Sequence, residues 1–106
     1  MPWPALVRVR GESMMPTYRD GDVLLVVRGV RPRAGRAAVV VLPPAPNGRP
    51  RPLAVKRVAG ADPQDPSRWW IDSDNPSAGV TSFDVGSLAT ADIVAVVIGG
   101  VGRRLR

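Results

Sequence analysis

The chain has 106 residues and a formal net charge of +6, with 44% hydrophobic and 23% charged residues. This size and composition predict one globular domain over residues 1–106 with a single modest core. Cysteine and histidine are both absent, which excludes disulfides, a cysteine nucleophile, histidine-based triads and zinc sites built from these two residues. Hydrolytic chemistry would have to come from Ser, Thr, Asp, Glu, Tyr or Lys.

Short strands separated by turns are expected along the whole chain. Alternating Val and Arg at residues 7–10 predict a half-buried strand that ends at Gly11. A compact turn over residues 11–17 and an Asp-Gly turn follow. Further strands are predicted at residues 23–27, 37–42, 53–59, 69–71 and 93–98. The segments between them are read as a loop (43–52), a turn of Asp and Pro (60–67) and a polar irregular segment (72–91). Twelve Pro and eleven Gly oppose long helices. The expected fold class is therefore mostly β, a small barrel or coiled sheet.

The N-terminal residues lack the apolar core of a secretory signal. The longest apolar stretch, residues 93–102, is about half of what a bilayer span requires and is expected to form a buried strand followed by a Gly-rich exit. The sequence therefore predicts a soluble, cytoplasmic domain with no membrane anchor in the chain, and leaves peripheral membrane association open.

Lys56 is the only lysine among fifteen basic residues. Arginine stays protonated in proteins, whereas a desolvated lysine can lose its proton. In a strand over residues 53–59, Lys56 shares one face with Ala54 and Val58, while Arg57 points the other way. Burial in that apolar stripe would lower the pKa of the amine and make it a general base. The alternative is a chance lysine whose head group reaches water.

Three segments of the chain resemble those of type I signal peptidases. GESMMPT (residues 11–17), followed by GDVLLV (residues 21–26), resembles the serine segment and its following strand. KRVAG (residues 56–60) resembles the lysine segment, and Asp74-Asn75 with Gly86 fall where the last segment is expected. The resemblance covers nearly the whole chain in the same order, and it implies a small coiled-sheet fold of the signal-peptidase and LexA-like type.

The resemblance implies a serine–lysine endopeptidase. Ser13 would attack the scissile carbonyl, Lys56 would take its proton, and the backbone N–H of Ser13 would help to bind the oxyanion. An extended substrate would add as a strand along residues 7–11, with Gly11, Met14 and Met15 contacting it. Packing in the core is the alternative role for Met14 and Met15.

The chain departs from the resembled pattern at three places. Gly11 replaces a serine that many members use as a second oxyanion donor. Gly79 falls where a serine often steadies the lysine, and Thr81 and Phe83 replace an Asp–Arg pair. Ser77 or Thr81 are candidates to stand in for the hydroxyl missing at position 79.

Small soluble members that resemble the chain include the maturation protease of nickel-type superoxide dismutase, which trims an N-terminal propeptide. The expected function is therefore cleavage of a propeptide or signal-like segment after small residues. The expected partner is a protein or peptide substrate that carries such a propeptide. No cofactor and no metal are expected.

Three other functions are alternatives. LexA-type self-cleaving regulators share the serine–lysine arrangement but need a cleavable segment before the serine, and only twelve residues precede Ser13. A degenerate protease would be retained as a peptide-binding module. A basic β-barrel that binds nucleic acid is less favoured, because the basic residues are scattered and five aromatic residues are spread through the chain.

Overall fold

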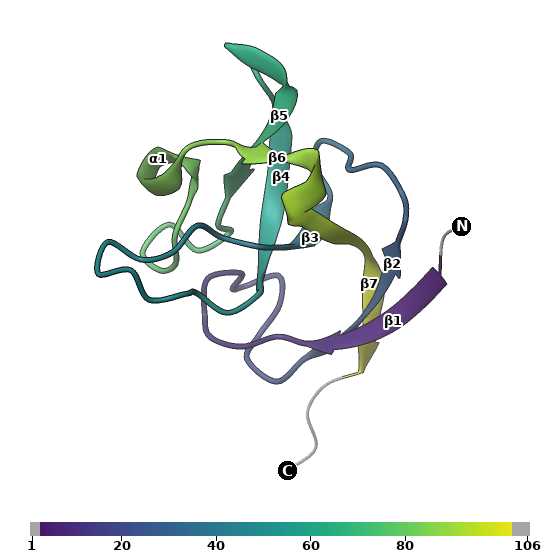
Figure 1. The fold of residues 1–106 in the computed structure, drawn as a ribbon. Coiled ribbons are helices and arrows are strands. Elements are labelled where there is room, and N and C mark those ends of the chain that lie inside the picture. Colours follow the sequence, from purple (N-terminus) through teal and green to yellow (C-terminus); the bar gives the residue numbers. More distant parts are fainter. Residues whose placement is uncertain (1–2, 103–106) are drawn as a thin grey trace.

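Residues 3–102 are described by the computed structural model and form one curled, open sheet of seven strands (Figure 1). The strands are β1 (Trp3–Arg8), β2 (Val23–Arg28), β3 (Ala37–Val40), β4 (Ala54–Asp62), β5 (Asp65–Asp72), β6 (Leu88–Ala89) and β7 (Ile93–Gly102). The short helix α1 (Ser82–Val85) precedes β6, and a 3-10 turn, η1 (Thr90–Asp92), precedes β7. The order across the sheet is β1-β2-β7-β3-β4-β5-β6, and every neighbouring pair is antiparallel. The mostly β fold expected from the sequence is confirmed.

The central strand β3 is buried on both faces and separates two hydrophobic clusters. One cluster lies toward β1, β2 and β7, and it contains Val9, Met14, Leu24, Val26, Ala37, Val39, Ala95 and Val97. The other lies toward β4 and β5, and it contains Ala38, Val40, Leu42, Val58, Trp69, Ile71, Leu88 and Ile93. The interior is therefore two small clusters that share β3, a division that length and composition do not reveal.

The predicted turn over residues 60–67 is wrong, because most of it lies in strands. β4 continues to Asp62 and β5 begins at Asp65. The two carboxylates accept backbone N–H groups close by, from Gln64 to Asp62 Oδ1 at 3.0 Å and from Ser67 to Asp65 Oδ1 at 3.1 Å. The Asp and Pro residues that suggested a loop therefore close a tight hairpin between two long strands.

Other boundaries differ from the prediction as well, and β3 ends at Val40 instead of residue 42. The segment over residues 72–91 is not wholly irregular, since it holds α1 and β6. A capping box between Thr81 and Asp84 starts α1. β1 begins at Trp3 and ends at Arg8, and β7 continues as a strand through the glycines to residue 102. In both strands the sheet pairing overrides weak local propensity.

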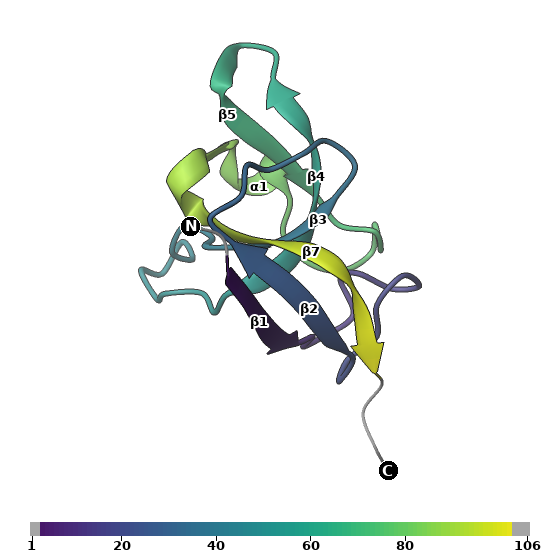
Figure 2. The same ribbon diagram turned by 90° about the vertical axis from the view of Figure 1, so that its right-hand side faces the viewer.

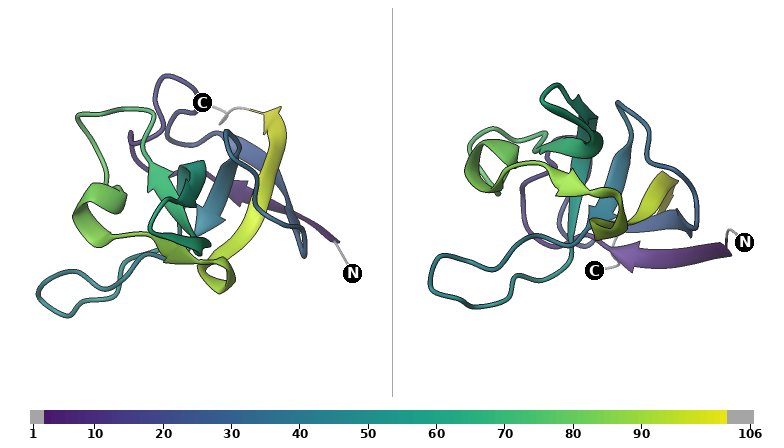
Figure 3. Two further views of the ribbon diagram at one scale, coloured as in Figure 1. Left: turned by 90° about the horizontal axis from the view of Figure 1, so that it is seen from above. Right: turned by 45° about the horizontal axis from the view of Figure 1, so that its top comes forward.

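Among the strands of residues 3–102, β1 forms one edge of the sheet and pairs with β2 alone. In Figure 2, β1, β2 and β7 lie side by side. The connection between β3 and β4, residues 41–53, projects away from the sheet (Figure 3). Within residues 3–102, no helix has the length and apolar character needed to cross a membrane.

Candidate active site

Ser13 lies in the loop between β1 and β2, and several contacts fix this loop. The backbone turns at Gly11, whose φ is +81°, and the Gly11 N–H donates to Asp20 Oδ1 at 2.8 Å. Met14 is 1% exposed and packs in the cluster toward β1 and β2. Ser13 itself is half-buried. Because the residues on both sides are anchored, the serine is presented on a rigid loop.

Asn75 holds the backbone of this loop from the other side of the site. Its backbone N–H donates to the Ser13 carbonyl at 2.9 Å, and its Nδ2 donates to the Glu12 carbonyl at 3.0 Å. These two hydrogen bonds from one residue fix the peptide groups on both sides of Ser13. Asn75 belongs to the third segment of the resemblance, to which sequence reasoning assigned no role.

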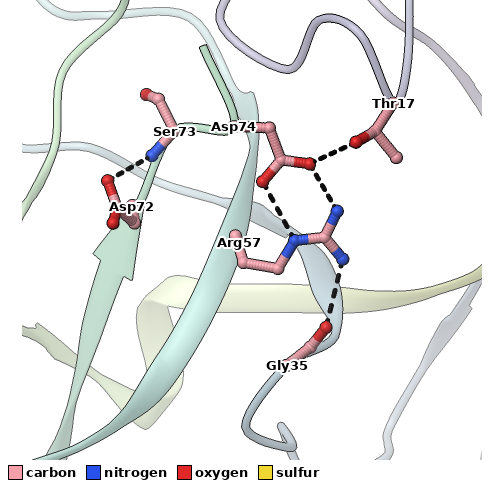
Figure 4. Close-up of polar contacts among 6 residues, drawn as sticks. All are labelled: Thr17, Gly35, Arg57, Asp72, Ser73 and Asp74. Carbon is pink, nitrogen blue, oxygen red and sulfur yellow. Dashed lines mark hydrogen bonds and ion pairs between the residues drawn. The ribbon is translucent and has the colours of Figure 1, made fainter. Parts of the chain in front are cut away.

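An ion pair behind the site ties three segments together (Figure 4). Arg57 Nε donates to Asp74 Oδ1 at 3.1 Å, and Arg57 Nη2 donates to Asp74 Oδ2 at 2.5 Å. Thr17 Oγ1 donates to the same Oδ2 at 2.6 Å, and Arg57 Nη1 donates to the Gly35 carbonyl at 3.1 Å. The hydrogen bond from Arg57 is the main cause that lowers the pKa of Asp74 below 3.8. The paired ions therefore join β4 to the serine loop.

Lys56 is buried on the opposite face of β4, as the alternation of the predicted strand requires. Its side chain is 2% exposed, and Val58 on the same face is fully buried. Ala38 of β3 lies opposite Lys56 in the register. Burial is the main cause that lowers the pKa of Lys56 below 10.5, while the charges of Asp84 and Asp72 act in the opposite direction. The arrangement favours a neutral amine.

Ser73 supplies the hydroxyl group that contacts Lys56. Lys56 Nζ donates to Ser73 Oγ at 3.1 Å, and Ser73 is 9% exposed. The two residues that the sequence offered in place of a serine at position 79 make other contacts. Ser77 Oγ donates to Asn75 Oδ1 at 2.8 Å, and Thr81 caps α1. Sequence reasoning missed Ser73. The antiparallel pairing of Arg57 with Asp72 places residues 56 and 73 opposite each other, so a correct strand register was the signal that could have found it.

Ser13, Lys56 and Ser73 meet around Gly79. A β-carbon built on Gly79 would lie 2.4 Å from Ser13 Cβ, 2.6 Å from Lys56 Nζ and 2.9 Å from Ser73 Oγ. The first two distances are measured from the same β-carbon, so Ser13 Cβ and Lys56 Nζ are no more than about 5 Å apart. This is close enough for the amine to act as a base on the Ser13 hydroxyl. Gly79 also has a φ of +84°, which favours glycine. Position 79 has no room for the expected serine.

The remaining predicted site residues take different positions. The Gly11 N–H is occupied by Asp20, and Met14 takes the core-packing role that was its alternative. Met15 is half-buried beside the serine. None of the hydrogen bonds among residues 3–102 uses the Ser13 N–H, which leaves this group available to an oxyanion.

A groove of about 370 Å³ runs between the strand edges that lead to Ser13 and Lys56. Its lining residues are Val7, Arg8, Arg10, Val39, Pro52, Leu53, Ala54 and Val55. β1 has a free edge, and β4 pairs with β5 only from Arg57 onward, so residues 54–56 pair on one side alone. A larger hollow, about 880 Å³, is lined by Trp70 and Phe83 among others, and neither hollow is lined by Ser13 or Lys56 themselves. The smaller groove is the better candidate for the substrate site because its lining residues lead along the chain to Ser13 and to Lys56.

A buried lysine, a loop serine and a curled antiparallel sheet together define a serine-type peptidase domain. A family model described as Peptidase S24-like matches residues 4–98, and the chain belongs to this family. The family is part of the clan that holds LexA-type and signal-peptidase-type serine peptidases, and its members in general use a serine–lysine dyad. No curated protein matches the chain significantly.

Proposed function

We propose that this chain is a serine endopeptidase in which Ser13 is the nucleophile and Lys56 is the general base. The observation that carries the proposal is the meeting of Ser13, Lys56 and Ser73 around Gly79. A serine hydroxyl needs a nearby base, and Lys56 is the one side chain of this group that can act as one. Its burial and lowered pKa suit that role.

In the proposed mechanism, the neutral amine of Lys56 takes the proton of Ser13 Oγ while the oxygen attacks the scissile carbonyl. The oxyanion of the tetrahedral intermediate accepts a hydrogen bond from the Ser13 N–H. Lys56 then passes its proton to the departing amine, which leaves an ester on Ser13. Lys56 activates a water that hydrolyses this ester and restores both groups. Ser73 acts as a positioning residue that orients the amine.

We propose that the substrate lies extended in the groove between β1 and β4. The free strand edges offer backbone hydrogen bonds to an added strand, and Met15 is available to contact a small side chain before the cut. An N-terminal propeptide or signal-like segment, trimmed during maturation of another protein, would suit such a groove because it is extended before cleavage. The proposed reaction needs no cofactor.

The test is cleavage of a diverse peptide library, read by mass spectrometry, with wild type, Ser13→Ala and Lys56→Ala side by side. Wild type is expected to cut after small residues, and both variants are expected to be inactive while keeping the wild-type circular dichroism spectrum. Cleavage that persists in Ser13→Ala would contradict the assignment of the nucleophile. Peptide binding without any cleavage would favour a degenerate, peptide-binding domain.

A further inference from the structure

Two arginines line the substrate groove and make no ion pair with the rest of the described chain. Arg8 and Arg10 both line the groove and are exposed. The ion pair found among residues 3–102 is Arg57 with Asp74. Within residues 3–102, the charges of Arg8 and Arg10 are therefore not paired with a carboxylate.

The backbone pattern places these arginines beside an added strand. The Val9 N–H donates to the Asp22 carbonyl at 2.8 Å, and the Val9 carbonyl accepts from the Gly21 N–H at 2.8 Å. Backbone groups alternate in direction along an extended chain, so those of Arg8 and Arg10 point to the free edge. An extended substrate would form its hydrogen bonds with these same two residues.

One side of the groove carries positive charge and the other side is mainly apolar. Val9 is buried, and the arginine side chains stand on the opposite face of the chain because alternate residues point to opposite sides. The other wall is mainly apolar and contains Val39, Leu53 and Val55. A bound strand also alternates, so every second side chain would lie on the arginine face and the others would lie on the apolar face.

We propose that this groove selects substrate segments with acidic side chains at alternate positions before the cut, recognised by Arg8 and Arg10. The planar guanidinium groups match carboxylates and can donate two parallel hydrogen bonds. The inference rests on the proposed peptidase function and adds the chemical class of the substrate.

The test compares three peptides of equal length that share one small residue before the cut and carry Glu, Gln or Lys at the alternate positions. For wild type, kcat/KM is expected to fall in the order Glu, Gln, Lys, with about a fivefold step between Glu and Gln, as exposed charge pairs typically give. The preference should shrink in about 1 M salt, where screening acts over about 3 Å. The double variant Arg8→Gln/Arg10→Gln should bring the Glu-to-Gln ratio to about one.

The matched control is Arg33→Gln/Arg36→Gln, which removes the same charge from an exposed loop that lines a separate hollow. It should keep the wild-type preference. A wild-type enzyme that cuts the Gln peptide without preferring Glu would overturn this inference and leave the proposed function standing. A preference that survives in Arg8→Gln/Arg10→Gln would overturn it as well. If wild type cuts none of the three peptides nor any library peptide, the proposed function fails and this inference fails with it.

Discussion

Gly79 lies so close to Ser13 that a β-carbon at position 79 would come within 2.4 Å of Ser13 Cβ. The same β-carbon would also reach the Lys56 amine and the Ser73 hydroxyl. The site is therefore built around a residue without a side chain, and the hydroxyl that contacts the lysine comes from Ser73 instead. A chain with a serine at 79 could not keep this arrangement.

Gly79→Ala should abolish peptidase activity and destabilise the fold. The new methyl group would push Ser13 and Lys56 apart, and overpacking of this kind costs about 1–3 kcal/mol, with about 1–2 kcal/mol more for the positive φ. Gly48→Ala is the control, because Gly48 has a φ of +83° but open space around it. Its free energy of unfolding should fall only by the backbone cost of the positive φ, and it should keep its activity. Urea denaturation and peptide cleavage check both variants, and equal effects would contradict the steric explanation.

Ser73→Ala should lower kcat about fivefold with little change in KM, since a lost hydrogen bond is worth about 1 kcal/mol and only the orientation of Lys56 changes. Ser73→Thr should recover part of the rate because it restores a hydroxyl. Ser77→Ala removes a hydroxyl that contacts Asn75 rather than Lys56, and it should leave kcat near the wild-type value. A larger loss in Ser77→Ala than in Ser73→Ala would show that the lysine is steadied in another way.

Lys56→Met should change how stability depends on pH. The pKa of Lys56 in the folded state lies below its ordinary value of 10.5. Between the two values the unfolded chain binds more protons than the folded one, so the wild-type free energy of unfolding rises with pH across that window. Lys56→Met should remove this slope and be more stable than wild type below the window. Urea denaturation at several pH values measures it, and an unchanged slope would mean that folding does not lower the pKa of Lys56.

Asp74→Asn should destabilise the protein by about 1–3 kcal/mol at neutral pH, because Arg57 loses its charged partner. The pKa of Asp74 is lowered in the fold, so its contribution is complete above pH 3.8 and is lost as the pH falls through the folded value. The variant should therefore lose part of the acid sensitivity of wild type. Glu12→Gln is the control, because Glu12 is exposed and its carboxylate makes no hydrogen bond within residues 3–102. It should behave as wild type in both respects.

Sequence patterns predicted the β class, and the alternation of residues 53–59 raised a buried Lys56 as one of two alternatives, which the structure decides in favour of burial. The motif around Ser13 placed the serine on a turn, and the structure brings it near Lys56. Ser73 escaped notice because its role depends on the pairing of β4 with β5, a long-range register that no local pattern encodes. The prediction of a turn over residues 60–67 was wrong for a related reason. Asp and Pro are typical of loops, but here they form the tight turn between two paired strands.

The central claim, that Ser13 is activated by a neutral Lys56, is tested most directly by measuring kcat/KM against pH for wild type, Ser13→Ala and Lys56→Arg. Arginine keeps the charge and length but cannot lose its proton. Wild-type activity should rise with pH through a midpoint below 10.5, in line with the lowered pKa of Lys56, and both variants should be inactive throughout. Activity in Lys56→Arg, or a wild-type midpoint at or above 10.5, would contradict the claim.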